Sequence, residues 1–212
     1  DAFAVAHADA AGDGTVTTFI VNSSGAILTK WLQTYEYGNT GSISGTAPTQ
    51  EIIKIDADTF AVANRGAGDD GFISTFDING TGAISTSVAQ NHEFDITDSE
   101  DFSAVLLDSD TVAIAYTNAA GGAITTVTIN STGAVSAGTT LQHDTVSAAG
   151  NDLVKVDSNT VALAYSGTIN TGGAVATVIK SFTIETDTLT GHTITEAHEN
   201  DTILGVPGTV HN

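Results

Sequence analysis

Short stretches of alternating large and small apolar residues recur along this chain of 212 residues. Four copies of one phrase, "AFAVAH", "TFAVAN", "TVAIAY" and "TVALAY", place Phe3, Phe60, Val112 and Val161 at matching positions, 57, 52 and 49 residues apart. Alternation with a period of two residues is typical of β-strands. A repeat of about 40–50 residues is typical of stacked supersecondary units. We therefore predict an all-β repeat protein.

Each unit contains four apolar or alternating stretches separated by turn residues. In the last unit, "LVKVD" precedes the turn Ser158-Asn159 and "TVALAYS", and a Gly-rich loop then leads to a third strand. Hairpins follow at "NSSG" (Asn22), "NGTG" (Asn79) and "NSTG" (Asn130), where we expect Asn and Gly to adopt positive φ. The fourth unit carries the variant "ETDTLTG". The pattern predicts four antiparallel strands in each unit.

This organisation resembles the blades of a β-propeller, and the resemblance covers the whole chain. It implies four blades of about 50 residues and four strands each, over residues 1–51, 52–102, 103–152 and 153–201 of a single domain. No subfamily is indicated, because the Trp-Asp, kelch, integrin-type and sialidase signatures are missing. A stacked β-solenoid and a pair of β-sandwiches are the alternative folds.

The two ends of the chain complement each other in this alignment. The chain opens in the second strand of a unit, and "TILGVPGTV" within residues 202–212 aligns with the first strand of the second unit. We expect this C-terminal strand to complete the N-terminal blade. Closure within one chain gives a four-bladed propeller, and closure between chains gives a larger ring or an open filament.

The charge of the chain excludes some classes of partner. Five basic residues face 25 acidic ones, giving a net charge of −20. Such a surface repels nucleic acid and anionic membrane surfaces and favours cations or high salt. No apolar run is long enough to span a bilayer. We expect a secreted or cell-surface protein, a reading that suits a chain beginning at Asp1 with no Met.

Binding residues are expected on the longer and more variable loops between the second and third strands. A His or Tyr followed by an acid also recurs near the end of each fourth strand and falls on the same side. Such pairs can bind a metal or a hydroxyl-rich ligand, or they can fix the crossover between blades through a hydrogen bond from His to a backbone carbonyl. The pairs are Tyr35-Glu36, His92-Glu93, His143-Asp144 and His198-Glu199.

Two further groups are candidate ligand sites. The loop acids Asp9, Asp13, Asp69 and Asp70 could bind calcium, although units three and four have no matching acid. Trp31, Tyr35 and Tyr37 share one side of a strand and could stack on sugar rings, or they could lie buried between blades. No other cofactor is indicated.

No set of residues has the converging unlike groups that catalysis requires. We therefore expect a non-catalytic binding module that presents a loop face to a glycan or protein ligand. The alternative is a structural assembly or filament subunit that self-associates through its end strands, and a glycoside-acting enzyme is a third reading.

Overall fold

A computed structural model of the chain describes residues 1–9, 12–27, 31–37, 50–85, 90–146, 148–168, 175–185 and 188–197. Fifteen strands and one short 3₁₀ helix form these parts. The elements are β1 (Ala2–Ala8), β2 (Gly14–Ile20), β3 (Gln33–Glu36), β4 (Gln50–Lys54), β5 (Thr59–Arg65), η1 (Ala67–Asp69), β6 (Gly71–Asp77), β7 (Gln90–Asp95), β8 (Glu100–Leu106), β9 (Thr111–Asn118), β10 (Gly121–Ile129), β11 (Val135–Asp144), β12 (Ala148–Lys155), β13 (Thr160–Thr168), β14 (Val175–Glu185) and β15 (Thr188–Ala197).

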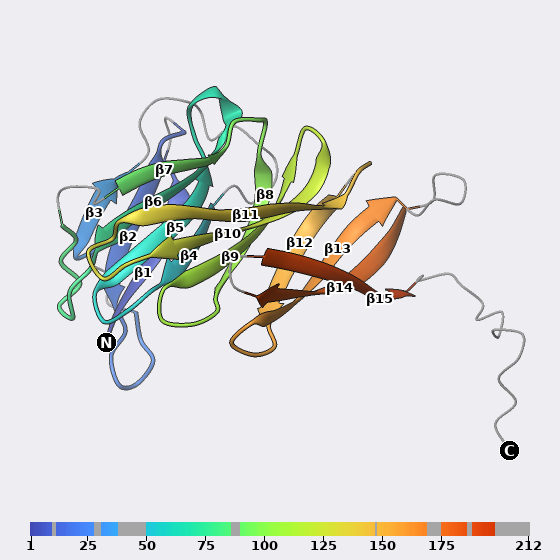
Figure 1. The fold of residues 1–212 in the computed structure, drawn as a ribbon. Coiled ribbons are helices and arrows are strands. Elements are labelled where there is room, and N and C mark those ends of the chain that lie inside the picture. The colour runs from blue at the N-terminus through green and yellow to red at the C-terminus, as the bar shows by residue number, and fades with distance from the viewer. Residues whose placement is uncertain are drawn as a thin grey trace, which may run out of the picture.

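The strands form four antiparallel sheets, each a simple meander (Figure 1). Sheet 1 contains β1–β3, sheet 2 contains β4–β7, sheet 3 contains β8–β11 and sheet 4 contains β12–β15. None of these sheets closes on itself. The all-β fold and the antiparallel repeat are therefore confirmed. Within the described residues, sheet 1 has three strands. They correspond to the second, third and fourth strands of the other sheets, so sheet 1 has no equivalent of their first strand there.

The repeated hairpins depend on the Asn side chain as much as on glycine. Gly25, Gly82 and Gly133 have φ between 75° and 82°, as predicted, because only glycine adopts this region without strain. The Asn residues do not have positive φ. Instead the side-chain oxygen of Asn79 accepts hydrogen bonds from both the backbone N–H and the hydroxyl of Thr81 and from the N–H of Ala83. Asn22 and Asn130 do the same. The Asn part of the prediction was wrong, because the amide acts as an acceptor.

The sheets pack face to face in the order of the chain, and each pair encloses its own apolar core. We call the face of a sheet that points toward the preceding sheet its leading face, and the opposite face its trailing face. Large side chains dominate the leading faces: Val112 and Ile114 of sheet 3 pack toward sheet 2. Small ones lie on the second strand of the trailing faces: Ala113 and Ala115 of the same strand pack toward sheet 4. This difference makes every contact directional.

Hydrogen bonds between neighbouring sheets repeat along with the apolar contacts. The hydroxyl of Thr18 in sheet 1 donates to the carbonyl of Gly82 in the hairpin of sheet 2, at 2.7 Å. Thr75 of sheet 2 donates in the same way to Gly133 of sheet 3, at 2.6 Å. A buried hydroxyl needs such an acceptor. The paired contacts fix the register of sheet 1 on sheet 2 and of sheet 2 on sheet 3.

The four sheets form an open row, with sheet 1 and sheet 4 at opposite ends (Figure 1). Close contacts join sheet 1 to sheet 2, sheet 2 to sheet 3 and sheet 3 to sheet 4. The predicted closing strand, residues 202–212, lies outside the described residues. Among the described residues no helix is long and apolar enough to cross a membrane.

Candidate functional site

Three carboxylates converge at the end of sheet 1 that carries the loop between β1 and β2, which we call the loop side. The loop between β1 and β2 carries Asp9 and Asp13, and Glu36 ends β3 opposite Thr15. One oxygen atom from each of the three acids lies within 4.8 Å of the others. The backbone N–H of Asp13 donates to the Asp9 carboxylate at 3.0 Å, which fixes the turn of the loop. Clustered carboxylate oxygens are the ligands that calcium prefers.

Sheet 2 brings two acids together at the corresponding place. Glu93 of β7 lies beside Asp70, which follows η1. Burial and this neighbouring carboxyl raise the pKa of Glu93, because both disfavour its charged form. In two consecutive sheets the acid of the predicted aromatic–acid pair therefore meets the predicted loop acids. The sequence predicted both groups and did not predict that they would meet.

Asp69 has a different environment. Its carboxylate accepts a hydrogen bond from Arg65 and forms an ion pair with it at 2.9 Å. Arg65 also contacts Asp98 at 2.9 Å and Glu100 at 3.5 Å, so this one guanidinium draws together acids from two sheets. The Asp69 carboxylate is therefore already paired with the Arg65 guanidinium. Calcium binding to Asp69 stays a prediction.

The predicted aromatic stripe divides between two environments. Tyr37 is buried against Phe76 of sheet 2, and its hydroxyl bonds to Gln50. Tyr35 packs against the same core. Trp31 is exposed and meets Phe19 edge to face at 6.2 Å. Tyr35 and Tyr37 thus lie between two sheets, as the alternative prediction of burial between blades has it. Of the three rings, only Trp31 faces solvent.

The buried histidine of sheet 3 lies in the core between sheets 3 and 4. The His143 ring packs against Tyr165 at 4.6 Å and Phe182 at 6.2 Å, and neither ring nitrogen has a hydrogen-bond partner. Burial, with the nearby Lys180 charge, lowers the pKa of His143 to about 4, so the ring is neutral at pH 7. The predicted bond from His to a carbonyl is not formed by this ring. Instead the His143 carbonyl accepts a hydrogen bond from Lys180.

The glycine opposite this histidine is required by close packing. A Cβ at Gly122 would lie 2.2 Å from Cε1 of His143. Asp144, the acid of the same pair, holds the next turn by accepting a hydrogen bond from the N–H of Val146. The His92 side chain is half-buried. His198 and Glu199 lie outside the described residues.

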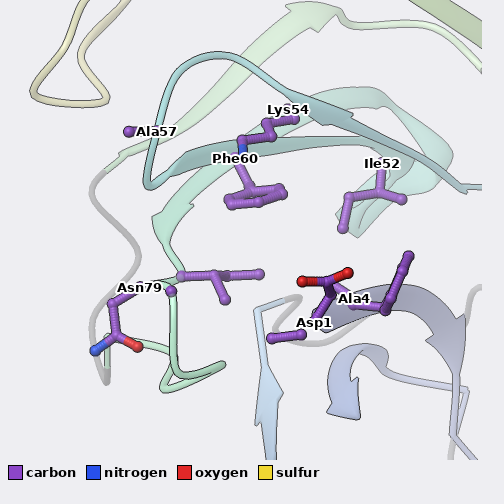
Figure 2. A pocket seen from close by; sticks show the side chains of 11 residues that line it. Asp1, Ala4, Ile52, Lys54, Ala57, Phe60 and Asn79 are labelled. Atoms are coloured by element: carbon purple, nitrogen blue, oxygen red, sulfur yellow. The ribbon is translucent and has the colours of Figure 1, made fainter. Parts of the chain in front are cut away.

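A cleft of about 470 Å³ opens between sheet 1 and sheet 2, near the N-terminus. Ile52 and Phe60 of sheet 2 face Asp1 and Ala4 of sheet 1 across it (Figure 2). The ammonium group of Lys54 lies over the Phe60 ring, 5.6 Å from its centre. In sheets 2, 3 and 4 an inner strand pairs with the strand equivalent to β1. The cleft lies along the edge of β1 where sheet 1, among the described residues, has no such strand.

Glu36 is the functional candidate that the sequence placed in a different group. It was predicted only as part of the Tyr35-Glu36 pair, and the structure adds it to Asp9 and Asp13. The available signal was positional. A residue ending the fourth strand must lie near the loop between the second and third strands, because neighbouring antiparallel strands share their ends.

Comparison with known proteins supports the fold alone. No protein-family model and no curated protein sequence matches the chain. A crystal structure of a protein from Lactobacillus plantarum, solved as a structural genomics target, is similar with a TM-score of 0.57 and 15% sequence identity. The match covers 92% of this chain and 54% of the other, so this chain spans about half of that protein's length. Together with the four antiparallel sheets, it supports a propeller-like architecture.

Proposed function

We propose that this chain is a non-catalytic, secreted or cell-surface binding module whose loop side binds a glycan or protein ligand with the help of a divalent cation. The observation that carries the proposal is the convergence of Asp9, Asp13 and Glu36. Calcium takes six to eight oxygen ligands, and extracellular sites commonly bind it with dissociation constants of about 10⁻⁴–10⁻³ M. A shared cation can bridge acidic protein groups and the hydroxyls or carboxylates of a ligand.

The environment of the buried histidine supports a binding role over a catalytic one. A general base has to reach the substrate and titrate near the working pH. His143 is enclosed by Tyr165 and Phe182, and its pKa is lowered to about 4. The ring therefore serves packing between sheets. Among the described residues, the acids on the loop side of sheet 1 are groups that can meet a ligand.

The scaffold for this site is proposed to be propeller-like, and each of the four units of the chain is proposed to have four strands. Residues 202–210 would add the inner strand of sheet 1 along β1 and fill the cleft beside Ile52 and Phe60. An apolar segment suits this place because Ala4, Ile52 and Phe60 line it. The strand could come from the same chain or from a second copy.

Calcium titration by calorimetry tests the binding proposal. Wild type is expected to bind with a dissociation constant of about 10⁻⁴–10⁻³ M at 0.15 M salt. Asp13→Asn should weaken binding roughly tenfold or more, because it removes one carboxylate of three. Asp58→Asn is the matched control. Asp58 is exposed in the turn between β4 and β5, and its substitution changes the net charge by the same amount as Asp13→Asn.

Two results would contradict the proposal. One is the absence of saturable calcium binding by the wild type. The other is an equal loss of affinity in Asp13→Asn and Asp58→Asn, which would mean that overall charge, and not a local site, attracts the ion. A glycan array probed with and without a chelator then identifies the ligand class, since binding should require calcium.

A structural assembly subunit is the second candidate function. The observation that favours it is the pair of apolar faces that no described sheet covers, at the two ends of the row of sheets.

A further inference from the structure

The leading face of sheet 1 carries apolar side chains that are buried at the same positions of the other sheets. Ile27 is 64% exposed, whereas its equivalents Ile84 and Val135 are 4% and 8% exposed. Val5 is also exposed, whereas the equivalent Val62 is fully buried. The difference cannot lie in residue type, because all are large and apolar. It arises because no described sheet precedes sheet 1.

Three aromatic rings enlarge this face. Phe3 is 47% exposed and stacks on Phe19 at 5.9 Å between ring centres, and Trp31 packs edge-on against Phe19. The equivalent pair in sheet 2 is Phe60 and Phe76, which are in register with each other and contribute to the core with sheet 1. A connected apolar patch of this kind on a soluble protein marks an interaction surface.

The trailing face of sheet 4 shows the complementary pattern. Val156 is 61% exposed, whereas the equivalent Ile55 and Leu107 are 6% and 1% exposed. Ile179 is 38% exposed, whereas the equivalent Ile73 and Ile124 are fully buried. Ala162 and Ala164 also lie on this trailing face. At the contacts inside the chain, the equivalent alanines pack against the leading face of the next sheet.

The polar partners of the contact are also present at the two ends. Ser181 of sheet 4 is the equivalent of Thr18 and Thr75. Each of the three pairs in register with the corresponding alanine of the second strand: Ala162, Ala4 and Ala61. Those threonines donate to the hairpin glycines of the next sheet. Gly25 is the matching glycine of sheet 1, and nothing lies within 4 Å of the position of its missing Cβ. At Gly82 that position lies 2.5 Å from Leu32 of the preceding sheet.

We propose that two copies of this chain associate head to tail, with the trailing face of sheet 4 of each copy seated on the leading face of sheet 1 of the other. Such a pair has twofold symmetry and two identical contacts, which leave no end face uncovered. It forms a ring of eight sheets.

The mass of the chain in solution, measured by light scattering after size exclusion, tests the proposal. Wild type is expected at about 43 kDa, twice the 21.5 kDa of one chain. Ile27→Asp on the leading face and Val156→Asp on the trailing face should each give a monomer, because burying an unpaired carboxylate is costly. Ile96→Asp is the matched control: Ile96 is 79% exposed between β7 and β8, outside both faces, and the variant should stay dimeric.

Mixing the two monomeric variants identifies the direction of the contact. Each variant keeps one intact face, so an equimolar mixture of Ile27→Asp and Val156→Asp should recover a species of about 43 kDa through one intact head-to-tail contact. An association of two leading faces predicts the opposite: Val156→Asp alone would remain a dimer. Circular dichroism of each variant distinguishes lost association from lost folding.

Three outcomes would overturn the proposal. These are a wild-type monomer at all concentrations, a dimer that persists in both face variants, and an open-ended series of masses, which would replace the closed pair with a filament. None depends on calcium, because the acids of the proposed cation site belong to the loop side of sheet 1. Failure of one proposal therefore leaves the other intact.

Discussion

Among the described residues, sheets 2 and 3 are covered on both faces, whereas sheets 1 and 4 are each covered on one. The residues at equivalent positions are nevertheless of the same kind. Ile73 in the middle of the row is fully buried, and Ile179 at its end is partly exposed. Burial in a repeat protein is thus set by the neighbouring unit and is not encoded by the unit alone.

The largest expected effect is a loss of stability when a middle contact is broken. Ile73→Ala removes a fully buried side chain and should lower the free energy of unfolding by about 2–5 kcal/mol. Ile179→Ala, the matched change at the end of the row, should cost less than about 1 kcal/mol at concentrations where the chain is monomeric. Urea unfolding at low protein concentration measures both. Equal losses would contradict the comparison.

A pH-dependent effect is expected at the contact between sheets 3 and 4. The pKa of His143 is about 4 in the folded chain and about 6.5 when unfolded, so the unfolded state binds more protons between these values. Stability should therefore fall as the pH drops from about 6.5 to 4, by on the order of 3 kcal/mol in total. His143→Phe should flatten this part of the profile.

The control for this prediction is His7→Gln, which removes an exposed histidine outside the contact between sheets 3 and 4. Unfolding free energies measured at several pH values between 4 and 7 supply the profiles. An unchanged slope in His143→Phe would show that other groups cause the pH dependence.

A smaller effect than those at Ile73 and His143 is expected at the proposed inner strand of sheet 1. A chain ending at residue 201 should lose about 1–2 kcal/mol, which corresponds to a fall of roughly 2–8 °C in the melting temperature for a chain of this size. Amide exchange along the open edge of β1 should become faster at the same time. Exchange rates equal to those of the full chain would mean that residues 202–210 do not pair with β1.

The repeat, the strand order and the hairpin positions could be predicted from the sequence because they depend on local patterns. Alternation at Phe60–Asn64 and glycine at Gly82 suffice to place a strand and a turn. Sheets 2, 3 and 4 begin at Gln50, Glu100 and Ala148, whereas the predicted bounds of the units stay a prediction.

The openness of the row could not be predicted in the same way, and the composition of the acid cluster could be predicted only in part. The angle between sheets depends on how Val112 and Ile114 fit against Ala61 and Ala63, a property of three-dimensional packing. Glu36 meets Asp13 only because β3 pairs with β2 in a particular register. Alternation likewise did not reveal that Tyr37 faces a core, since both faces of an internal sheet are apolar.

The alternation of large leading and small trailing side chains along the second strand of each sheet has a consequence for how such chains change over generations. Because every contact joins the same two kinds of face, an internal duplication or loss of one whole unit would leave each remaining sheet with a fitting neighbour. The number of units is then free to vary without redesign of any contact. Directional faces thus allow growth by the copying of whole units.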